Sequence, residues 1–561
     1  MHRLLLLLLL LLPDYALSQS TADLLITGGQ IYTVSEVKPT VEAVLVKGDK
    51  IAFAGSLEDA QRGVDAETRI LDLNGKTMIP GFIEGHAHLL GIGYGVQELN
   101  LYEASNYSDI VEQVATAVAN AQPGEWIIGN GWHQSKWDTE PGTVVKGFQT
   151  HALLSEVSPE NPVLLNHASG HALMVNANAL KLAGISNETL MIEGGEIIRD
   201  DNGLPTGIFT ENAMDLVYGV VPEPTPEDHK QAVRLALAEM ASNGITSLQD
   251  ARSTRMDIEA VRAVLTEGTR TGRLWLMLAG LEEPLMTEWL ENGPEIGRYN
   301  NFLTIRAIKL SSDGALGSRG AWLLEPYSDR PGFSGAPLLP MESVLAMSNA
   351  ALRSGFQLCV HAIGDRANQE VLNQFEVAFN GKHSDARFRI EHAQHLDLAD
   401  IERFAQLGVI ASMQGIHLSS DRPWAIERLG KKRIEDGAYV WRKLVDSGAI
   451  LINGTDAPVE PINPLASFYA LVSRKTLAGT PEGGYEPSQK LTRSEALKSY
   501  TLNAAYAAFE DGIKGSIEAG KLADFTILSG DLMTVPEDEI LNLSIEQTIV
   551  GGATVYSRPD L

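Results

Sequence analysis

The amino-acid sequence predicts an α/β protein built on a (β/α)8 TIM-like barrel, and three observations support this. From about residue 227 to residue 509, segments of helical periodicity alternate with short apolar segments, as they do around a parallel sheet. Many of the short segments end in a polar residue, at the place where barrels carry their chemistry. The alternative is an open doubly wound sheet, but no GxGxxG motif follows a predicted strand.

The first residues have the pattern of a signal peptide, assigned to residues 1–18. Arg3 supplies a positive charge, residues 4–12 form an apolar run too short to span a bilayer, and residues 16–18 (ALS) offer small side chains for cleavage. We therefore expect an exported protein, periplasmic or secreted, with no stable membrane insertion after cleavage. An uncleaved anchor is the alternative.

The two ends of the mature chain predict one composite β-sandwich. Residues 19–80 hold short alternating strands punctuated by glycine, such as ADLLITGGQIYTV and EAVLVKGDKIAFAG. Residues 510–561 repeat this pattern in GSIEAGKLADFTILSGD and IEQTIVGGATVYS. We expect these segments to pair, with the barrel inserted between them as residues 81–509. Residues 181–223, rich in glycine, proline and charge, are expected to form an insertion in the barrel.

Within the barrel segment the expected elements follow one another in order. The strand PGFIEGHAHL is followed by the helix SDIVEQVATAVANA and by the strand-like runs WIIGNGW and PVLLNHASGHALMV. After residue 223 the expected strands are ITSLQDA, LWLMLAG, FLTIRAIKL, QLCVHAIGD, FRIEHAQ, VIASMQ and AILINGTDAP. Helices such as DHKQAVRLALAEMASNG and MESVLAMSNAALRSG separate them. The pattern predicts about eight strand–helix units.

The composition limits the classes of function. A net charge of −28 would repel a phosphate backbone, so no nucleic-acid partner is expected. The single cysteine, Cys359, lies in an apolar run and is expected to be a buried structural thiol, and it excludes both an intrachain disulfide and a thiolate metal cluster. A small-molecule substrate fits these limits, and the sequence is compatible with a homo-oligomer.

Metal-ligating side chains gather at the expected strand ends. His86 and His88 lie two residues apart on one strand, so their imidazoles share a face. The other strand ends carry Lys309, His361, His392 and Asp456. Each alone has an ordinary explanation, as a hydrogen-bonded histidine, a salt-bridged lysine or a helix-capping aspartate. Their joint position at one barrel mouth predicts a site for a divalent metal.

Several ordered motifs resemble those of the amidohydrolase superfamily. Within it, the chain is similar to amidohydrolase family 3, the YtcJ-like group that includes N-substituted formamide deformylases. The motifs are PGFIEGHAHL, GNGWHQSKW, SGHALMVN, IKLSSDGALGSRGAWL, HAIGDRA, RIEHAQ, GTDAPV and GSIEAGKLADFTIL. The resemblance covers the mature chain and implies a metal-dependent hydrolase that acts on non-peptide carbon–nitrogen bonds of small-molecule amides.

The resemblance also implies a role for each mouth residue. The implied ligands are His86, His88 and Asp456 for one ion, His361 and His392 for a second, and Lys309, as a CO2-derived carbamate, between them. The alternative is one ion beside an unmodified Lys309. Zinc is the expected metal, and iron, manganese and nickel remain open. Asp456 is expected to act as general base and then general acid for a metal-activated water.

Four further residues are candidates for substrate contact: His171, Asp313, Arg319 and Trp132. Each has a structural alternative, namely a hydrogen-bonded core histidine, a mutual Asp313–Arg319 pair and a packed tryptophan. Two rival functions remain open. One is hydrolysis of a cyclic amide, an N-acyl amino acid or a dipeptide, and the other is a catalytically silent metal or small-molecule binding protein.

Overall fold

The computed structural model describes residues 21–102, 104–134, 137–168, 172–190, 192 and 195–559. The chain forms two compact units. The first comprises Met1–His88, Met240–Thr254 and Arg270–Leu561, and the second comprises Leu89–Glu239 and Arg255–Thr269. The expected signal peptide falls outside the described residues. In the described part, no helix combines the length and the apolar character that a bilayer crossing requires.

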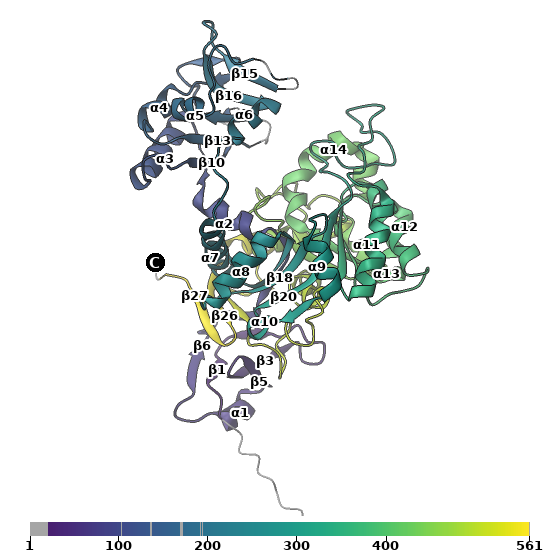
Figure 1. Cartoon of the computed structure of the whole chain (residues 1–561). Coiled ribbons are helices and arrows are strands. Elements are labelled where there is room, and N and C mark those ends of the chain that lie inside the picture. Colours follow the sequence, from purple (N-terminus) through teal and green to yellow (C-terminus); the bar gives the residue numbers. More distant parts are fainter. Residues whose placement is uncertain are drawn as a thin grey trace, which may run out of the picture. The chain divides into compact units, whose positions relative to one another are not determined.

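A parallel sheet in the first unit closes almost completely into a barrel, which confirms the predicted fold class (Figure 1). In spatial order its strands are β8 (Phe82–Ala87), β17 (Ile245–Ser253), β18 (Arg273–Ala279), β20 (Leu303–Ser311), β21 (Gln357–Ala362), β22 (Arg389–His392), β23 (Ile410–Gln414) and β24 (Leu451–Gly454). Two backbone hydrogen bonds of 2.8 Å join β8 to the residues after β24, from Asp456 N–H to His86 O and from His88 N–H to Ala457 O. The barrel is therefore tied together at its carboxyl end.

The barrel strands are apolar because both of their faces are covered. β18 reads RLWLMLA, and all of its residues are buried. The helices of the first unit that follow the later strands are α9 (Leu285–Asn292), α11 (Met341–Ser354), α12 (Asp365–Ala378), α13 (Ile401–Leu407), α14 (Gly415–Gly437), α15 (Trp441–Asp446), α16 (Pro464–Ser473), α17 (Arg493–Ser499) and α18 (Leu502–Ala507). Helix α17 starts with a capping box of Thr492 and Glu495.

The two ends of the chain share one sheet, as the sequence predicted. Strand β7 (Thr77–Pro80) pairs with the C-terminal strand β25 (Phe525–Leu528) and leads directly into β8. The full order is β27 (Ala553–Ser557), β26 (Ile545–Val550), β25, β7, β2 (Gln30–Tyr32) and β3 (Thr40–Val41). A second sheet has the order β5 (Lys50–Gly55), β4 (Ala43–Lys47), β1 (Leu24–Thr27) and β6 (Arg69–Asp72). Both sheets contribute side chains to one apolar core, as in a sandwich.

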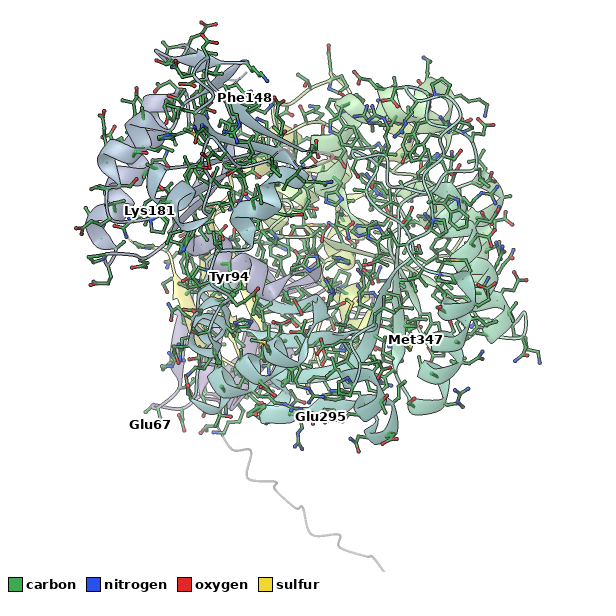
Figure 2. All side chains as sticks on the ribbon, turned by 45° about the horizontal axis from the view of Figure 1, so that its top comes forward. Glu67, Tyr94, Phe148, Lys181, Glu295 and Met347 are labelled. Atoms are coloured by element: carbon green, nitrogen blue, oxygen red, sulfur yellow. The ribbon has the colours of Figure 1, made fainter. Side chains whose placement is uncertain are left out.

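The second unit has a mixed sheet of its own. Its strand order is β15 (Gly195–Arg199), β16 (Pro205–Glu211), β14 (Ala172–Val175), β13 (Val163–His167), β10 (Ile127–Trp132) and β9 (Leu99–Asn100). Its helices include α2 (Leu89–Gln97), α3 (Tyr107–Asn120), α5 (Ala177–Leu182) and α8 (Arg255–Thr266), and α7 (Pro226–Ser242) begins in it. Figure 2 shows Lys181 pointing outward at the last turn of α5.

The extent of this unit differs from the predicted organisation. An insertion was expected at residues 181–223, with the runs WIIGNGW and PVLLNHASGHALMV in the barrel. The structure instead places these runs in β10, β13 and β14 of the separate sheet, which begins with β9 at Leu99. Short apolar strands look alike in sequence, and only long-range pairing decides which sheet they join.

Candidate metal centre at the barrel mouth

The predicted mouth residues converge at the carboxyl end of the barrel. Ring centroids lie 5.8 Å apart for His86 and His88, 4.9 Å for His86 and His392, and 4.5 Å for His361 and His392. Asp456 Oδ1 lies 3.1 Å from His88 Nε2 and 3.4 Å from His86 Nε2. Residues from three different barrel strands and from the segment after β24 thus meet in one place.

Buried partners on the far side of the rings orient two of the histidines. His86 Nδ1 lies 2.5 Å from Glu391 Oε2, and this carboxylate is itself held by Arg389 Nε at 2.7 Å. His392 Nδ1 lies 2.8 Å from Gln414 Oε1. Because an oxygen acceptor on Nδ1 fixes the proton there, the lone pair of each ring is left on Nε2, facing the mouth.

The local electrostatics keep the imidazoles of His361 and His392 available as ligands. Burial, helped by the charge of Lys309, lowers the pKa of His361 to about 3. Burial and the neighbouring His361 hold the pKa of His392 well below its usual value. Both rings are therefore neutral near pH 7, and a neutral imidazole is the form that ligates a metal.

Asp456 is the acid of the site. Burial raises its pKa, but the adjacent imidazoles of His86 and His88 outweigh burial and hold the pKa well below its usual value, so the carboxylate is ionised. Its backbone has φ +60°, and that of His392 has φ +75°. Residues other than glycine are uncommon in this left-handed region, at a cost of about 1–3 kcal/mol each, and such strain gathers at functional sites.

Lys309 lies on β20 and is 7% exposed. Burial lowers its pKa, although the charges of Glu391 and Asp456 oppose this. A lowered pKa favours the neutral amine, which is the form of lysine that can react with CO2. The side chain of Lys309 is therefore chemically suited to form the carbamate that the resemblance to the amidohydrolase superfamily implies.

Three buried atoms test whether these residues fit a metal ion. Among the described residues, His86 Nε2, His361 Nε2 and Asp456 Oδ1 have no hydrogen-bond partner. A buried polar atom without a hydrogen bond costs about 1–3 kcal/mol of folding stability, so these three atoms are candidates to bind a ligand. The described residues also contain one group of three ligand atoms within 4.8 Å of one another, His86–His88–Asp456. Imidazole nitrogen and carboxylate oxygen are the donors that zinc accepts, so these residues fit a divalent metal.

Asp313 is the first of the candidate substrate residues. Asp313 is buried and accepts N–H hydrogen bonds from Trp322, Ile363 and Gly364 at 2.8–3.0 Å, and its Oδ1 lies 3.5 Å from His361 Nε2. Burial raises its pKa to about 7. It therefore braces the loop beside His361.

Arg319 and Trp132 have other partners than the metal-ligating side chains. Arg319 forms a bidentate salt bridge with Asp329, from Nε to Oδ1 at 3.1 Å and from Nη2 to Oδ2 at 2.8 Å. No such pair with Asp313 is found among the described residues. Trp132 is buried in the apolar core of the second unit and donates to Leu165 O at 2.9 Å. His171 lies outside the described residues. Their contact with substrate remains a prediction.

Four buried residues beside the site were missed by the sequence analysis: Glu84, Glu391, Gln414 and His417. Glu84 accepts N–H bonds from His86 at 3.1 Å and Thr455 at 2.8 Å, which ties the first strand to the segment that carries Asp456. The signal for Glu84 and Glu391 was present, since each is a charged residue within an apolar strand and next to a predicted ligand. His417 and Gln414 had no comparable signal.

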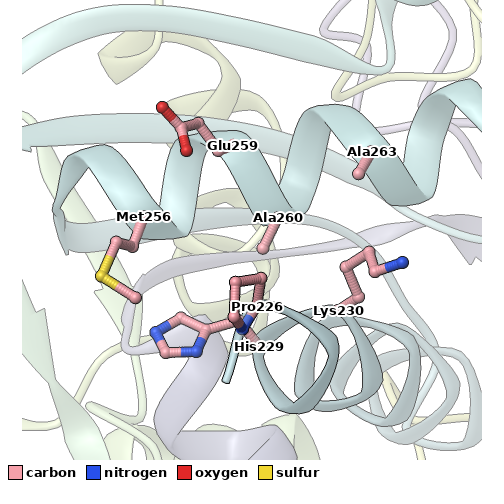
Figure 3. Close-up of a pocket in the computed structure, with 7 residues that line it drawn as sticks. All are labelled: Pro226, His229, Lys230, Met256, Glu259, Ala260 and Ala263. Carbon is pink, nitrogen blue, oxygen red and sulfur yellow. The ribbon is translucent and has the colours of Figure 1, made fainter. Parts of the chain in front are cut away.

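A separate hollow lies between α7 and α8 in the second unit. Figure 3 shows its lining, with the aliphatic and polar side chains of Pro226, His229, Lys230, Met256, Glu259, Ala260 and Ala263. No convergent set of ligand atoms like that of the barrel mouth occurs there among the described residues.

Comparisons with known proteins identify the family of the chain. The model of the amidohydrolase family matches residues 69–556. The chain is 33% identical to the putative amidohydrolase YtcJ of Bacillus subtilis (strain 168), over 95% of this chain and 99% of the relative. It is 28% identical to the N-substituted formamide deformylase of Arthrobacter pascens, over 96% of this chain and 98% of the relative.

A solved structure is similar along nearly the whole chain. It is an uncharacterized metal-dependent hydrolase from Pyrococcus horikoshii OT3, with 27% identity and a TM-score of 0.75 over 92% of this chain and 99% of that one. The family match spans most of the sequence and includes all the strands that carry the mouth residues. The chain belongs to the amidohydrolase family.

Proposed function

We propose that the protein is a metal-dependent amidohydrolase that cleaves a non-peptide carbon–nitrogen bond of a small amide, of the N-substituted formamide type. The observation that carries the proposal is the set of three buried ligand atoms at the mouth that lack a hydrogen bond among the described residues, on His86, His361 and Asp456. The similarity to an N-substituted formamide deformylase supports the bond type. Export to the periplasm or medium, and action without a nucleic-acid partner, belong to the same proposal.

When bound, a divalent ion would lower the pKa of a water molecule toward neutrality and polarise the amide carbonyl. We infer that His86, His88, His361, His392, Lys309 and Asp456 hold it. Glu391 and Gln414 hold Nδ1 of His86 and His392, which leaves Nε2 of both rings to ligate an ion, and loss of such partners typically weakens metal affinity.

The chain's own groups move the proton. Asp456 Oδ1 is ionised and has no hydrogen-bond partner among the described residues, so it is free to accept the proton of the attacking water. The same oxygen can then deliver the proton to the leaving amine, as a general base and then a general acid. The lone thiol, Cys359, is fully buried, and burial raises its pKa far above its usual value, so it is no nucleophile.

The first test removes the metal. Chelation of the purified chain should abolish hydrolysis of an N-substituted formamide, and zinc should restore it, with metal content measured by mass spectrometry. Asp456→Asn should lower kcat by about 100- to 10,000-fold, the range of acid–base catalysis. The matched control Asp436→Asn changes an exposed aspartate that pairs with Lys432 and should leave kcat unchanged. A fully metallated chain that hydrolyses no amide in a panel would refute the proposal.

Carboxylation of Lys309 is tested separately. Protein grown with 13C-labelled bicarbonate should give a carbamate carbon signal in the NMR spectrum, and Lys309→Arg should remove it. Lys309→Arg should also reduce the bound metal from two ions to at most one. An unmodified Lys309 in a fully metallated chain would leave the one-metal form of the site.

A further inference from the structure

The barrel closes at a seam between its first and last strands. The hydrogen-bonded order of its sheet runs from β8 to β24, and no ladder pairs these two strands in the described part of the chain. Glu84 lies on β8 and is fully buried. Its Oε1 accepts N–H bonds from His86 at 3.1 Å and from Thr455 at 2.8 Å, and its Oε2 accepts the Thr455 hydroxyl at 3.1 Å. A side chain therefore supplies hydrogen bonds across the seam where strand pairing is missing.

Glycine residues on both strands leave room for this carboxyl group. A Cβ atom on Gly454 would lie 2.3 Å from Glu84 Oε1 and 2.6 Å from the backbone nitrogen of His86. A Cβ atom on Gly85 would lie 2.5 Å from Asn453 O. Any larger residue at either position would force the two strands apart, because most of these neighbours are backbone atoms. The close approach of the strands and the place of the Glu84 carboxyl group thus depend on each other.

The partners of Glu84 differ from those of the other buried glutamate at the site. Glu391 pairs with Arg389 at 2.7 Å, whereas Glu84 forms no ion pair with a lysine or an arginine among the described residues. Burying a carboxyl group costs free energy that hydrogen bonds must offset. Two of its three hydrogen bonds come from Thr455, the residue directly before Asp456. The carboxyl group of Glu84 is therefore committed to the segment that carries the acid of the site.

The Thr455 hydroxyl extends this contact to both sides of Asp456. It donates to Glu84 and accepts the N–H of Ala457 at 3.2 Å. Asp456 itself has a left-handed backbone, with φ +60°, and its N–H donates to His86 O at 2.8 Å. A residue other than glycine keeps such a conformation only where its surroundings impose it. The hydrogen bonds of the residues before and after Asp456 are the contacts that impose it.

We propose that Glu84 is a positioning residue for Asp456, and that it acts through the Thr455 hydroxyl. The backbone held in this way places Asp456 Oδ1 at 3.1 Å from His88 Nε2 and 3.4 Å from His86 Nε2. This inference rests on the proposed function, because Asp456 is the proton-transfer group of that function. A general base must lie within hydrogen-bond reach of its proton, and a displacement of about 1 Å can lower a rate about 100-fold.

Cobalt(II) bound to the full chain tests the positioning without hydrolysis, because its visible absorption depends on the geometry of its ligands. Thr455→Val removes the hydroxyl and keeps the side-chain shape, so it should change the cobalt spectrum and weaken cobalt affinity by about 10-fold or more. Thr455→Ser keeps the hydroxyl and should retain the wild-type spectrum. The control Thr548→Val removes a buried hydroxyl that donates to Ala241 O at 2.6 Å, and it should also retain that spectrum. An unchanged spectrum for Thr455→Val, or equal changes for the valine and serine variants, would overturn the proposal.

Kinetics at saturating metal then show whether Glu84 acts through Asp456. On an N-substituted formamide, Glu84→Leu and Thr455→Val should each lower kcat about 10- to 100-fold and leave KM nearly unchanged. Glu84→Gln keeps one acceptor oxygen, so its loss should be smaller than that of Glu84→Leu. In the Asp456→Asn background the same changes should have little further effect, because groups that act through one another are not additive. Full additivity would overturn the proposal. If the wild type hydrolyses no amide, the proposed function fails, and the cobalt spectra still decide the positioning role.

Discussion

The amino end of the barrel holds a buried, hydrogen-bonded ion pair, whereas buried polar atoms at its carboxyl end lack hydrogen bonds among the described residues. At the amino end, Arg273 of β18 meets Asp524, which precedes β25 of the sandwich, through two hydrogen bonds of 2.7 and 2.9 Å. Asn301 O and Gly551 N–H satisfy further atoms of this pair at 3.1 and 2.8 Å. At the carboxyl end, Asp456 Oδ1 and His361 Nε2 are also buried, but neither forms a hydrogen bond among the described residues.

The difference separates stability from function. A buried ion pair is tolerated when its remaining hydrogen-bonding capacity is filled, and the amino-end pair meets that condition. Atoms left unpaired in a folded protein cost free energy and persist where a ligand completes them. The amino end therefore anchors the sandwich to the barrel, whereas the carboxyl end is prepared for a metal and a substrate, as in barrels generally.

Breaking the saturated pair should give the largest effect on stability. Arg273→Ala leaves Asp524 buried without a counter-charge, so the free energy of unfolding should fall by about 3–5 kcal/mol. Urea denaturation measures the loss, and kcat per folded molecule should not change because the pair lies away from the mouth. The control Arg558→Ala removes a partly exposed pair with Glu546, for which we expect about 0–1 kcal/mol. A loss no larger than that of the control would contradict the anchoring role.

The same comparison explains how far the sequence could be interpreted. The barrel and its mouth were predictable because strands such as β18 are continuously apolar and His361 or His392 interrupts that pattern at the strand end. Cys359 was predicted to be a buried thiol, and it is fully buried. The sheet of the second unit was not predictable, because β10 and β13 resemble barrel strands in length and composition.

Helix α14 was missed for a local reason. Its sequence contains Pro423 and Gly430, which normally end or kink a helix, and between β23 and β24 the only helix predicted was the one through VWRKLVDSG. Its first turn nevertheless belongs to the mouth, because it begins directly after β23 with Gly415 N–H donating to Asn453 Oδ1 at 2.8 Å. The pattern of strand ends therefore predicted His392 but not His417, whose ring stacks on it.

Replacing Gln414, which positions His392 at the carboxyl end of the barrel, should have an intermediate effect. Gln414→Leu removes the acceptor at His392 Nδ1 without changing charge, so the preferred tautomer of the ring is lost. Metal affinity should fall about 10- to 100-fold, which corresponds to about 1.4–2.8 kcal/mol. Competition with a chromogenic chelator measures it, and Gln414→Glu, which keeps an acceptor, should bind metal more tightly than Gln414→Leu. Equal affinities for the two variants would remove the positioning role of Gln414.

The smallest effect should come from the partly exposed ion pair between Arg442 and Glu495. Hydrogen bonds from Arg442 lower the pKa of Glu495 from 4.5 to about 2, and Glu495 also completes the capping box of α17. A carboxyl whose pKa is lowered on folding stabilises the fold above its unfolded pKa, and the contribution is lost as the pH falls from about 4.5 toward about 2. Glu495→Gln should therefore cost about 1 kcal/mol at pH 7. The difference in unfolding free energy between the wild type and Glu495→Gln, measured by urea denaturation, should shrink between pH 5 and pH 3. Glutamine can still form the cap, so a difference that does not change with pH would mean that the charge of Glu495 contributes nothing.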